Sequence, residues 1–131
     1  MPSRAADWLR QARRDLNHAR NALADGDFEW ACFAAQQAAE KSVKAVYEHL
    51  HGEGWGHSVG KLLKDLPAPH SPTPELIDRA LRLDKHYIPT RYPNGFPTGA
   101  PGDYFTRPEA EQAIQDAEAV LAFCTAAVPG A

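Results

Sequence analysis

Cysteine is scarce in this chain, and long apolar runs are missing. Two of the 131 residues are cysteine, and Cys32 and Cys124 both fall on the apolar sides of segments with helical periodicity, where we expect buried free thiols in a reducing compartment. The N-terminus turns charged at once, and no run approaches the roughly 18 apolar residues that a membrane span requires. We therefore expect a cytoplasmic protein without a membrane segment.

Metal-binding patterns are also absent from the sequence. The six histidines lack the paired spacing of a zinc site, and the two cysteines lie too far apart along the chain to supply one. We expect no metal and no cofactor. At 131 residues the chain can fold without either, as one domain over residues 1–131.

A strong charge of one sign is missing as well. Lysine and arginine number 14 against 17 acidic residues, which gives a formal net charge of -3. Bulk electrostatics will not draw such a protein to a polyanion. Any binding of nucleic acid must therefore use a local patch of the surface.

What the sequence does contain is helical periodicity along nearly its whole length. Apolar residues from Ala5 to Leu23 predict a first helix, which ends where Gly26 can take positive φ and Asp27 can cap the next helix. The segment from Phe28 to Leu50 predicts a central bundle helix, because small side chains let other helices approach it closely. These small residues are Ala31, Ala34, Ala35, Ala38, Ala39 and Ala45.

Three more helices are predicted beyond this one. A short helix covers about residues 58–66, and a fourth begins at Pro74 after a capping threonine, with Tyr87 on its apolar side. The last helix opens with a capping box at Thr106 and Glu109. No segment shows a strand pattern. The predicted fold is therefore all-α: an up-and-down bundle of four long helices plus a short fifth helix, with a long loop before the last helix.

That loop, at residues 89–105, is hard to explain by packing alone. Loops of this length inside a compact bundle are usually functional or disordered. Prolines, glycines and aromatic residues recur through it, which favours a stiff loop pinned by ring contacts. It is either part of a binding site or an aromatic lid over the open end of the bundle.

Three features of the sequence together resemble the HEPN family. They are the stretch from Ala31 to Ala45 with its Gln36-Gln37 pair, the start His57-x-x-x-x-Leu62, and the exit Tyr87-x-x-x-Arg91-Tyr92-Pro93. The resemblance covers roughly residues 6–127. It implies a helical bundle that is usually dimeric and is often encoded beside a nucleotidyltransferase-type partner. Members of the family are either metal-independent RNases that act as toxins or inert relatives that bind nucleotides or RNA.

The RNase branch of the family uses the motif Arg-x(4-6)-His. Its histidine moves a proton, and its arginine neutralises charge that builds on the phosphate. No histidine follows Arg91 at that spacing. The motif that the resemblance would anchor at Arg91 is therefore not intact.

The same spacing occurs elsewhere in the chain. Arg13 and His18 diverge by about 140° around a helix, which is too far for them to share a phosphate. Arg79 and His86 return to nearly one face of a helix, with Arg82 one turn before the histidine. If RNA is cleaved, we expect His86, Arg79 and Arg82 to be the catalytic residues.

The competing hypothesis is binding without cleavage. Arg91 offers a planar fork for a phosphate, and three tyrosines offer rings that can stack on a base or ribose. Lys41 adds a positive charge on the second predicted helix. The predicted contacts with a nucleotide or RNA are therefore Arg91, Tyr92, Tyr87, Tyr104 and Lys41.

Two of these residues, Arg91 and Lys41, also have a structural alternative. Arg91 could bond to loop carbonyls or pair with Asp84 or Asp103, and Lys41 could belong to a solvated face. His57 is expected to bond to backbone at the start of a helix.

A third possibility is a dimeric adaptor without a ligand. An alanine-lined helix can pack against its own copy across a two-fold axis, and a polar cluster could then recognise a nucleotidyltransferase-type protein in a toxin-antitoxin-like pair. We expect a homodimer. The sequence favours a domain that binds nucleotide, RNA or a partner over an active nuclease.

Overall fold

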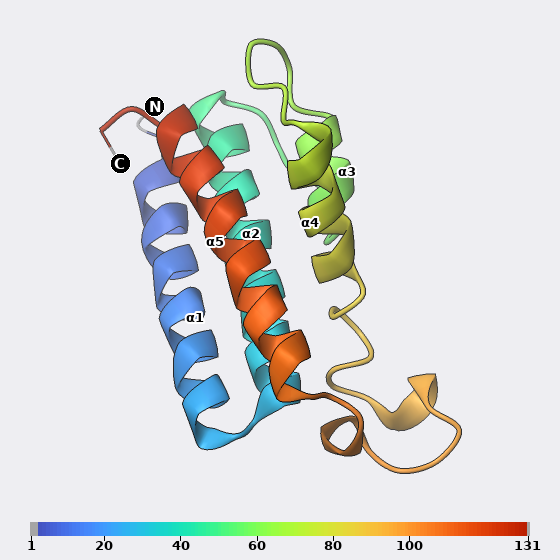
Figure 1. Cartoon of the computed structure of the whole chain (residues 1–131). Helices are drawn as coiled ribbons and strands as arrows, with labels where there is room; N and C mark the ends of the chain where they lie inside the picture. Colours follow the sequence, from blue (N-terminus) through green and yellow to red (C-terminus); the bar gives the residue numbers. More distant parts are fainter. Residues whose placement is uncertain (1–2, 131) are drawn as a thin grey trace.

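The computed structural model describes residues 3–130, and over that range it consists of helices, turns and loops. Its elements are α1 (Ala5–Asp25), α2 (Phe28–His49), α3 (Val59–Lys64), α4 (Pro74–Asp84), two 3-10 turns η1 (Pro93–Gly95) and η2 (Pro101–Asp103), and α5 (Arg107–Ala127). The prediction of an all-α bundle with one short helix and a long loop before the last helix is confirmed (Figure 1).

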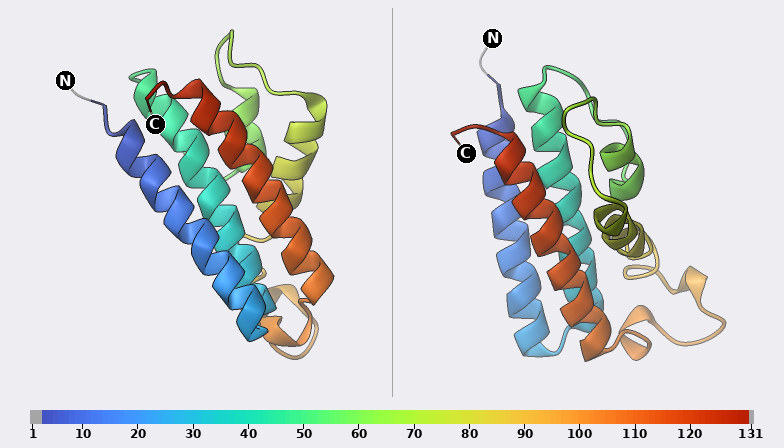
Figure 2. Two further views of the ribbon diagram at one scale, coloured as in Figure 1. Left: turned by 60° about the vertical axis from the view of Figure 1, so that its left-hand side comes forward. Right: turned by 45° about the horizontal axis from the view of Figure 1, so that its top comes forward.

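The helices form two layers. α1, α2 and α5 run side by side along their lengths (Figures 1 and 2). α3 and α4 pack against each other and against α2, and α4 also packs against α5. The α1–α2 turn and the loop that precedes α5 lie at the same end of the bundle (Figure 1). No described helix combines the length and the apolar character that crossing a bilayer would require.

The turn between α1 and α2 follows the prediction at one residue and departs from it at the next. Gly26 has φ 82°, a left-handed conformation, and its N–H closes the last turn of α1. Asp27 occupies the N-cap position of α2, but its side chain makes no capping bond. Its ψ of 70° lies outside the extended conformation found at the three helix starts that a side chain does cap. The predicted cap by Asp27 is therefore wrong.

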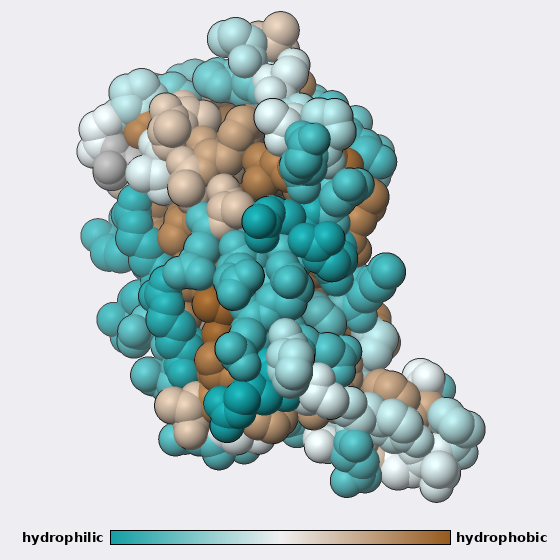
Figure 3. Space-filling view, viewed as in Figure 1, coloured by the Kyte–Doolittle hydropathy of each residue, from teal (hydrophilic) through white to brown (hydrophobic). Residues whose placement is uncertain are grey.

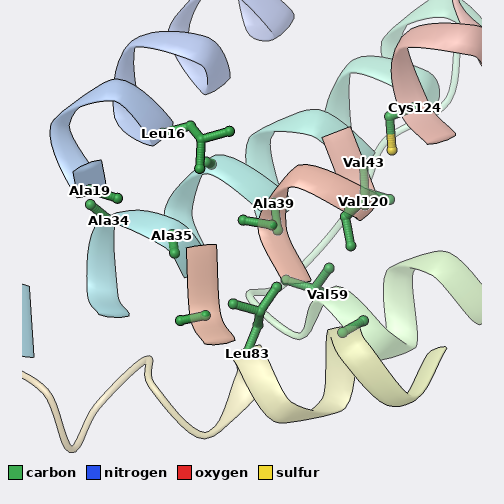
Figure 4. Packing of buried hydrophobic residues seen from close by; sticks show 14 of the residues in the cluster. Leu16, Ala19, Ala34, Ala35, Ala39, Val43, Val59, Leu83, Val120 and Cys124 are labelled. Atoms are coloured by element: carbon green, nitrogen blue, oxygen red, sulfur yellow. The ribbon is translucent and has the colours of Figure 1, made fainter. Parts of the chain in front are cut away.

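Small side chains on α2 let its neighbours approach closely. All the alanines that the sequence analysis assigned to its packing side are buried. They belong to one core cluster with Leu16 of α1, Leu83 of α4 and Val120 of α5 (Figure 4). α2 is therefore the central helix of the bundle, as the alanine spacing predicts.

Both cysteines are free and buried. Burial raises the pKa of the Cys32 thiol to about 12 and also raises the pKa of Cys124. The thiolate is the reactive form of cysteine, so both side chains act as small apolar packing groups.

The last residue of α4 anchors the start of α3. The carboxylate of Asp84 accepts hydrogen bonds from the Ser58 hydroxyl at 2.7 Å, from the Val59 N–H at 2.6 Å and from the Gly60 N–H at 3.1 Å. The first N–H groups of a helix have no partner within the helix. Asp84 supplies one, and it thereby joins the two helices of the second layer.

α4 ends earlier than the sequence predicted. Its last helical residue is Asp84, and residues 85–91 continue as turns and bends. Pro89 disfavours helical geometry at the residue before it, which explains why the helix does not continue. Tyr87 therefore does not lie on the apolar side of α4, and the spacing of Arg79 and His86 is not that of a regular helix.

The loop at residues 89–105 is held by ring contacts, as predicted. Phe96 stacks on Tyr104 with centroids 4.2 Å apart, and it meets the edge of Phe105 at 6.2 Å. The loop contacts α2 at η2, while its middle part projects from the side of the molecule (Figure 3). The two ends of the loop thus contact the bundle, at Arg91 and at η2.

We expect Asp84→Ala to lower the free energy of unfolding by about 1 to 3 kcal/mol, because backbone donors at the start of α3 lose their partner. Urea denaturation measures the difference. The control is Asp78→Ala, which removes an exposed carboxylate from the same helix and should change the free energy by no more than about 0.5 kcal/mol. Equal effects of the two substitutions would contradict the anchoring role of Asp84.

Candidate functional site

Arg91 lies among three aromatic rings. Its guanidinium carbon is 4.4 Å from the ring centroid of Phe33, 4.8 Å from that of Tyr87 and 5.1 Å from that of Tyr92. Nε and Nη2 both donate to the Tyr87 carbonyl, at 2.9 and 2.7 Å. The other guanidinium N–H groups have no protein partner within residues 3–130. Arg91 is therefore held by rings and one carbonyl while part of its donor edge stays free.

This arrangement follows from the early end of α4. Carbonyls in the turns after Asp84 lack the regular partners of a helix, and side chains of the same turns supply donors to them. The Thr90 hydroxyl donates to the His86 carbonyl at 2.6 Å, and Arg91 donates to the Tyr87 carbonyl. Thr90 is buried, whereas Arg91 is half-buried. Hydrogen bonds within the turn thus fix its backbone, and Arg91 lies where the turn is partly exposed.

Of the structural roles considered for Arg91, bonding to a main-chain carbonyl is observed and pairing with a carboxylate is not. Asp84 is occupied at the start of α3. Asp103 accepts from the Ala100 N–H at 2.9 Å within its own turn. No carboxylate therefore neutralises Arg91 within the part of the chain that the structure describes.

The buried carboxylate of Glu40 on α2 supports Arg91 indirectly, through two neighbouring rings. Glu40 is 5% exposed. It accepts from Lys44 Nζ at 3.0 Å and lies 3.2 Å from His57 Nδ1. The His57 ring stacks on Tyr87, with centroids 4.4 Å apart and planes 17° apart. Through His57, the carboxylate fixes one of the rings on which the arginine lies.

This network was not predicted from the sequence. His57 was expected to bond to backbone through its side chain, whereas the ring faces Glu40 and the His57 carbonyl accepts from Gln36 Nε2 at 3.1 Å. Gln36 also donates to Glu40 at 3.2 Å. A signal was present: Gln36 and Glu40 are one turn apart on the side of α2 that the alanines bury, and buried polar groups require partners.

The structure brings together Arg91, Tyr87 and Tyr92, three of the residues predicted to contact a ligand. Tyr92 is 47% exposed, so its ring has a free surface. Tyr104 lies elsewhere, stacked within the loop. Lys41 faces α1, where it forms an ion pair with Asp15. It is half-buried and paired, so it is not part of a purely solvated face.

A second cluster joins α4 to α5. Asp116 is 1% exposed and accepts from Arg79 at 3.0 Å and from Arg82 through two bonds of 2.8 and 3.0 Å. The residues proposed for cleavage therefore do lie near one another, since Arg82, Asp116 and His86 line one hollow of about 360 Å³. Both arginines, however, are bound to a carboxylate.

His86 is a neutral ring in this hollow. Its burial lowers its pKa from the ordinary value of 6.5, and its Nδ1 is buried without a hydrogen-bond partner. The ring edge meets Phe105 at a centroid distance of 5.7 Å. A neutral imidazole can accept a proton, which is the role that cleavage of RNA would require.

The Arg91 group suits an anion. A partly free guanidinium is a donor array for phosphate oxygens, and half-exposed rings can stack on a base. Within the described residues, no group of three or more His, Cys, Asp or Glu side chains is placed to hold a metal ion.

Comparison with known proteins agrees with this architecture. A family model described as HEPN domain matches residues 5–127. Among solved structures, the protein TT1696 from Thermus thermophilus is 47% identical, with a TM-score of 0.94 over 96% of this chain and 99% of that one. No curated protein matches the chain.

Two further structures are similar over most of their length. ST0689, an archaeal HEPN homologue, is 38% identical, with a TM-score of 0.80 over 98% of this chain and 99% of that one. A HEPN domain protein from Thermotoga maritima, TM0613, is 38% identical, with a TM-score of 0.75 over 92% and 95%. Because the family model and these structures cover nearly all of its residues, the chain belongs to the HEPN domain family.

Proposed function

We propose that this domain binds a phosphate of a nucleotide or of RNA at Arg91 without cleaving it. The observation that carries the proposal is the free donor edge of a guanidinium that is already held in place by three rings and a carbonyl. A side chain that is ordered before binding loses little entropy when the ligand arrives. Tyr92, which is half exposed, offers its ring to the base or ribose.

We place the domain in the Arg-Tyr-Pro branch that is associated with nucleotidyltransferases. In this proposal it is a cytoplasmic homodimer that works with a nucleotidyltransferase-type protein in a toxin-antitoxin-like pair. Two observations support the proposal: the Arg91-Tyr92-Pro93 sequence and the large apolar side chains at the surface. These side chains include Trp55, Leu81 and Ile88.

A second candidate function is a metal-independent endoribonuclease at the hollow between α4 and α5. The specific observation in its favour is the unpartnered, neutral His86 beside Arg82. The bonds of Arg79 and Arg82 to the buried Asp116 oppose it, because those bonds must weaken before either arginine can neutralise a phosphate. We therefore rank binding above cleavage.

The first prediction from this proposed function concerns Arg91. Isothermal titration with ATP, and fluorescence anisotropy with a short labelled RNA, should show binding to the wild type. Arg91→Ala should weaken it by about tenfold to a hundredfold, because charge-assisted hydrogen bonds contribute about 1.5 to 3 kcal/mol. Arg91→Lys should recover only part of the affinity, since lysine lacks the planar fork.

Arg107→Ala is the matched control, because Arg107 also lies over a ring, that of Phe28 at 5.0 Å. It should leave affinity unchanged. Circular dichroism checks that helix content is retained in all variants. If the wild type binds neither ligand, or if the Arg107 variant loses as much affinity as the Arg91 variant, the proposed function is wrong.

The second prediction concerns cleavage. We expect purified wild-type protein and His86→Ala to leave a labelled RNA equally intact on a denaturing gel, and overexpression of either to permit normal growth. The reason is that Asp116 already occupies both arginines. Cleavage or growth arrest by the wild type that His86→Ala abolishes, and that the control Lys85→Ala retains, would instead establish the nuclease.

A further inference from the structure

The outward face of α1 is basic and uncovered. The ribbon of Figure 2 (left) shows no other described helix across this side of α1. The residues on this side lie between Arg10 and Asn21. They line an open groove of about 690 Å³. We call this surface the α1 face; its arginine, histidine and amide residues are Arg10, Gln11, Arg13, Arg14, Asn17, His18 and Asn21.

The positive charge of the α1 face is only partly neutralised. Asp15, the one carboxylate among the groove residues, forms an ion pair with Lys41 of α2. Arg10 pairs with Asp7 at 2.8 Å, whereas Arg14 has no ion pair within residues 3–130 and is exposed. The chain as a whole carries a net charge of -3, so this face is a local exception of the kind that a polyanion needs.

Aromatic side chains continue the α1 face toward the Arg91 site. Asp15 and His18 also border a smaller hollow of about 240 Å³ whose other side holds Trp30 and Phe33. Trp30 is 48% exposed, and its ring meets the edge of Phe33 at 6.2 Å. The guanidinium of Arg91 lies over that same Phe33 ring. The basic groove, the exposed tryptophan and Arg91 therefore form one continuous surface.

We propose that this surface is a track for a single-stranded nucleic acid, with Trp30 stacking on a base, the α1 face contacting successive phosphates and Arg91 holding one more phosphate. The proposal rests on the proposed function and extends it from one phosphate to a chain of them. Cations on α1 and at Arg91, with an exposed ring between them, suit the phosphates and bases of an unpaired strand. A duplex would hide the base faces that Trp30 requires.

The length of the track sets the size of the ligand. Arg10 and Asn21 are roughly 16 Å apart along α1, since a helix rises about 1.5 Å per residue. A mononucleotide that sits at Arg91 cannot also reach the far end of that face. Affinity should therefore rise with oligonucleotide length and fall with salt, as counterions are released from each neutralised phosphate.

The test compares ATP with a fluorescent oligouridylate and an oligodeoxythymidylate of equal length, by anisotropy at two salt concentrations. Arg14→Ala combined with His18→Ala should weaken oligonucleotide binding about tenfold and flatten its salt dependence, and Trp30→Ala should weaken it by a similar factor. None of these changes should alter the affinity for ATP. Arg20→Ala is the control, because Arg20 is bound to Glu118 of α5 at 2.9 Å and should behave as wild type.

The outcomes separate this inference from the proposed function. If Arg91→Ala weakens ATP and oligonucleotide while the α1 and Trp30 variants match Arg20→Ala, the track does not exist and the phosphate site stands. If the α1 and Trp30 variants lose oligonucleotide but Arg91→Ala keeps its affinity for both ligands, the α1 face and Trp30 bind the strand without Arg91, and both the proposed function and the part of Arg91 in the track are wrong. Substitutions that change only the oligomeric state of the protein would show that the surface serves protein contact and would overturn the track.

Discussion

The placement of the candidate site depends on one buried carboxylate. Glu40 is held on the alanine-lined side of α2, where water is excluded, and an ionised group there must be surrounded by donors. Gln36 and Lys44 supply two of them from the same helix, and His57 supplies the third contact from the segment before α3. That last contact matters most for function, because the imidazole stacks on the tyrosine whose carbonyl holds the arginine. Removal of the Glu40 carboxylate would leave His57 without this contact, and the Tyr87 ring beside Arg91 would lose the support of a fixed imidazole.

Two other carboxylates organise the second layer in the same manner. Asp84 joins the end of α4 to the start of α3, and Asp116 joins α5 to the arginines of α4. Buried ion pairs contribute little net stability, yet they penalise alternative packings in which a charge would be left alone. α3 is six residues long and cannot be stable by itself. Its position is therefore set by the capping carboxylate and by apolar contact, and the turns that carry Arg91 begin at the residue after that same carboxylate.

The sequence predicted the fold well because alanine spacing, proline starts and the Thr106 capping box are local signals that packing did not override. One of its failures was also local. The length of α4 was overestimated because apolar periodicity continued past the point at which Pro89 makes a helix unfavourable. The Glu40 network could not be predicted in detail, since its third partner, His57, is brought back by the connection after α2, and sequence spacing does not report where a loop returns. Lys41, which was predicted together with Arg91, pairs with Asp15 of α1 and lines the hollow that also contains Phe33.

The division of α1 into two sides explains why a nearly neutral domain can still offer a basic surface. Toward α5, Arg20 is tied to Glu118, and Arg13 reaches the Thr125 hydroxyl at 3.5 Å, so these arginines add specificity to helix packing. Toward α2, the carboxylate of Asp15 is matched by a lysine, and Arg14 is left without an ion pair in the described part of the chain.

Had stability alone shaped this helix, a glutamate at a neighbouring exposed position would have offset the charge of Arg14 at little cost. Arg14 instead lines a groove that shares His18 with the hollow at Trp30 and Phe33, and the Phe33 ring is in contact with the guanidinium of Arg91. Uncompensated charge that is connected through aromatic rings to a second, partly free guanidinium is better explained by an anionic ligand than by the packing of the bundle.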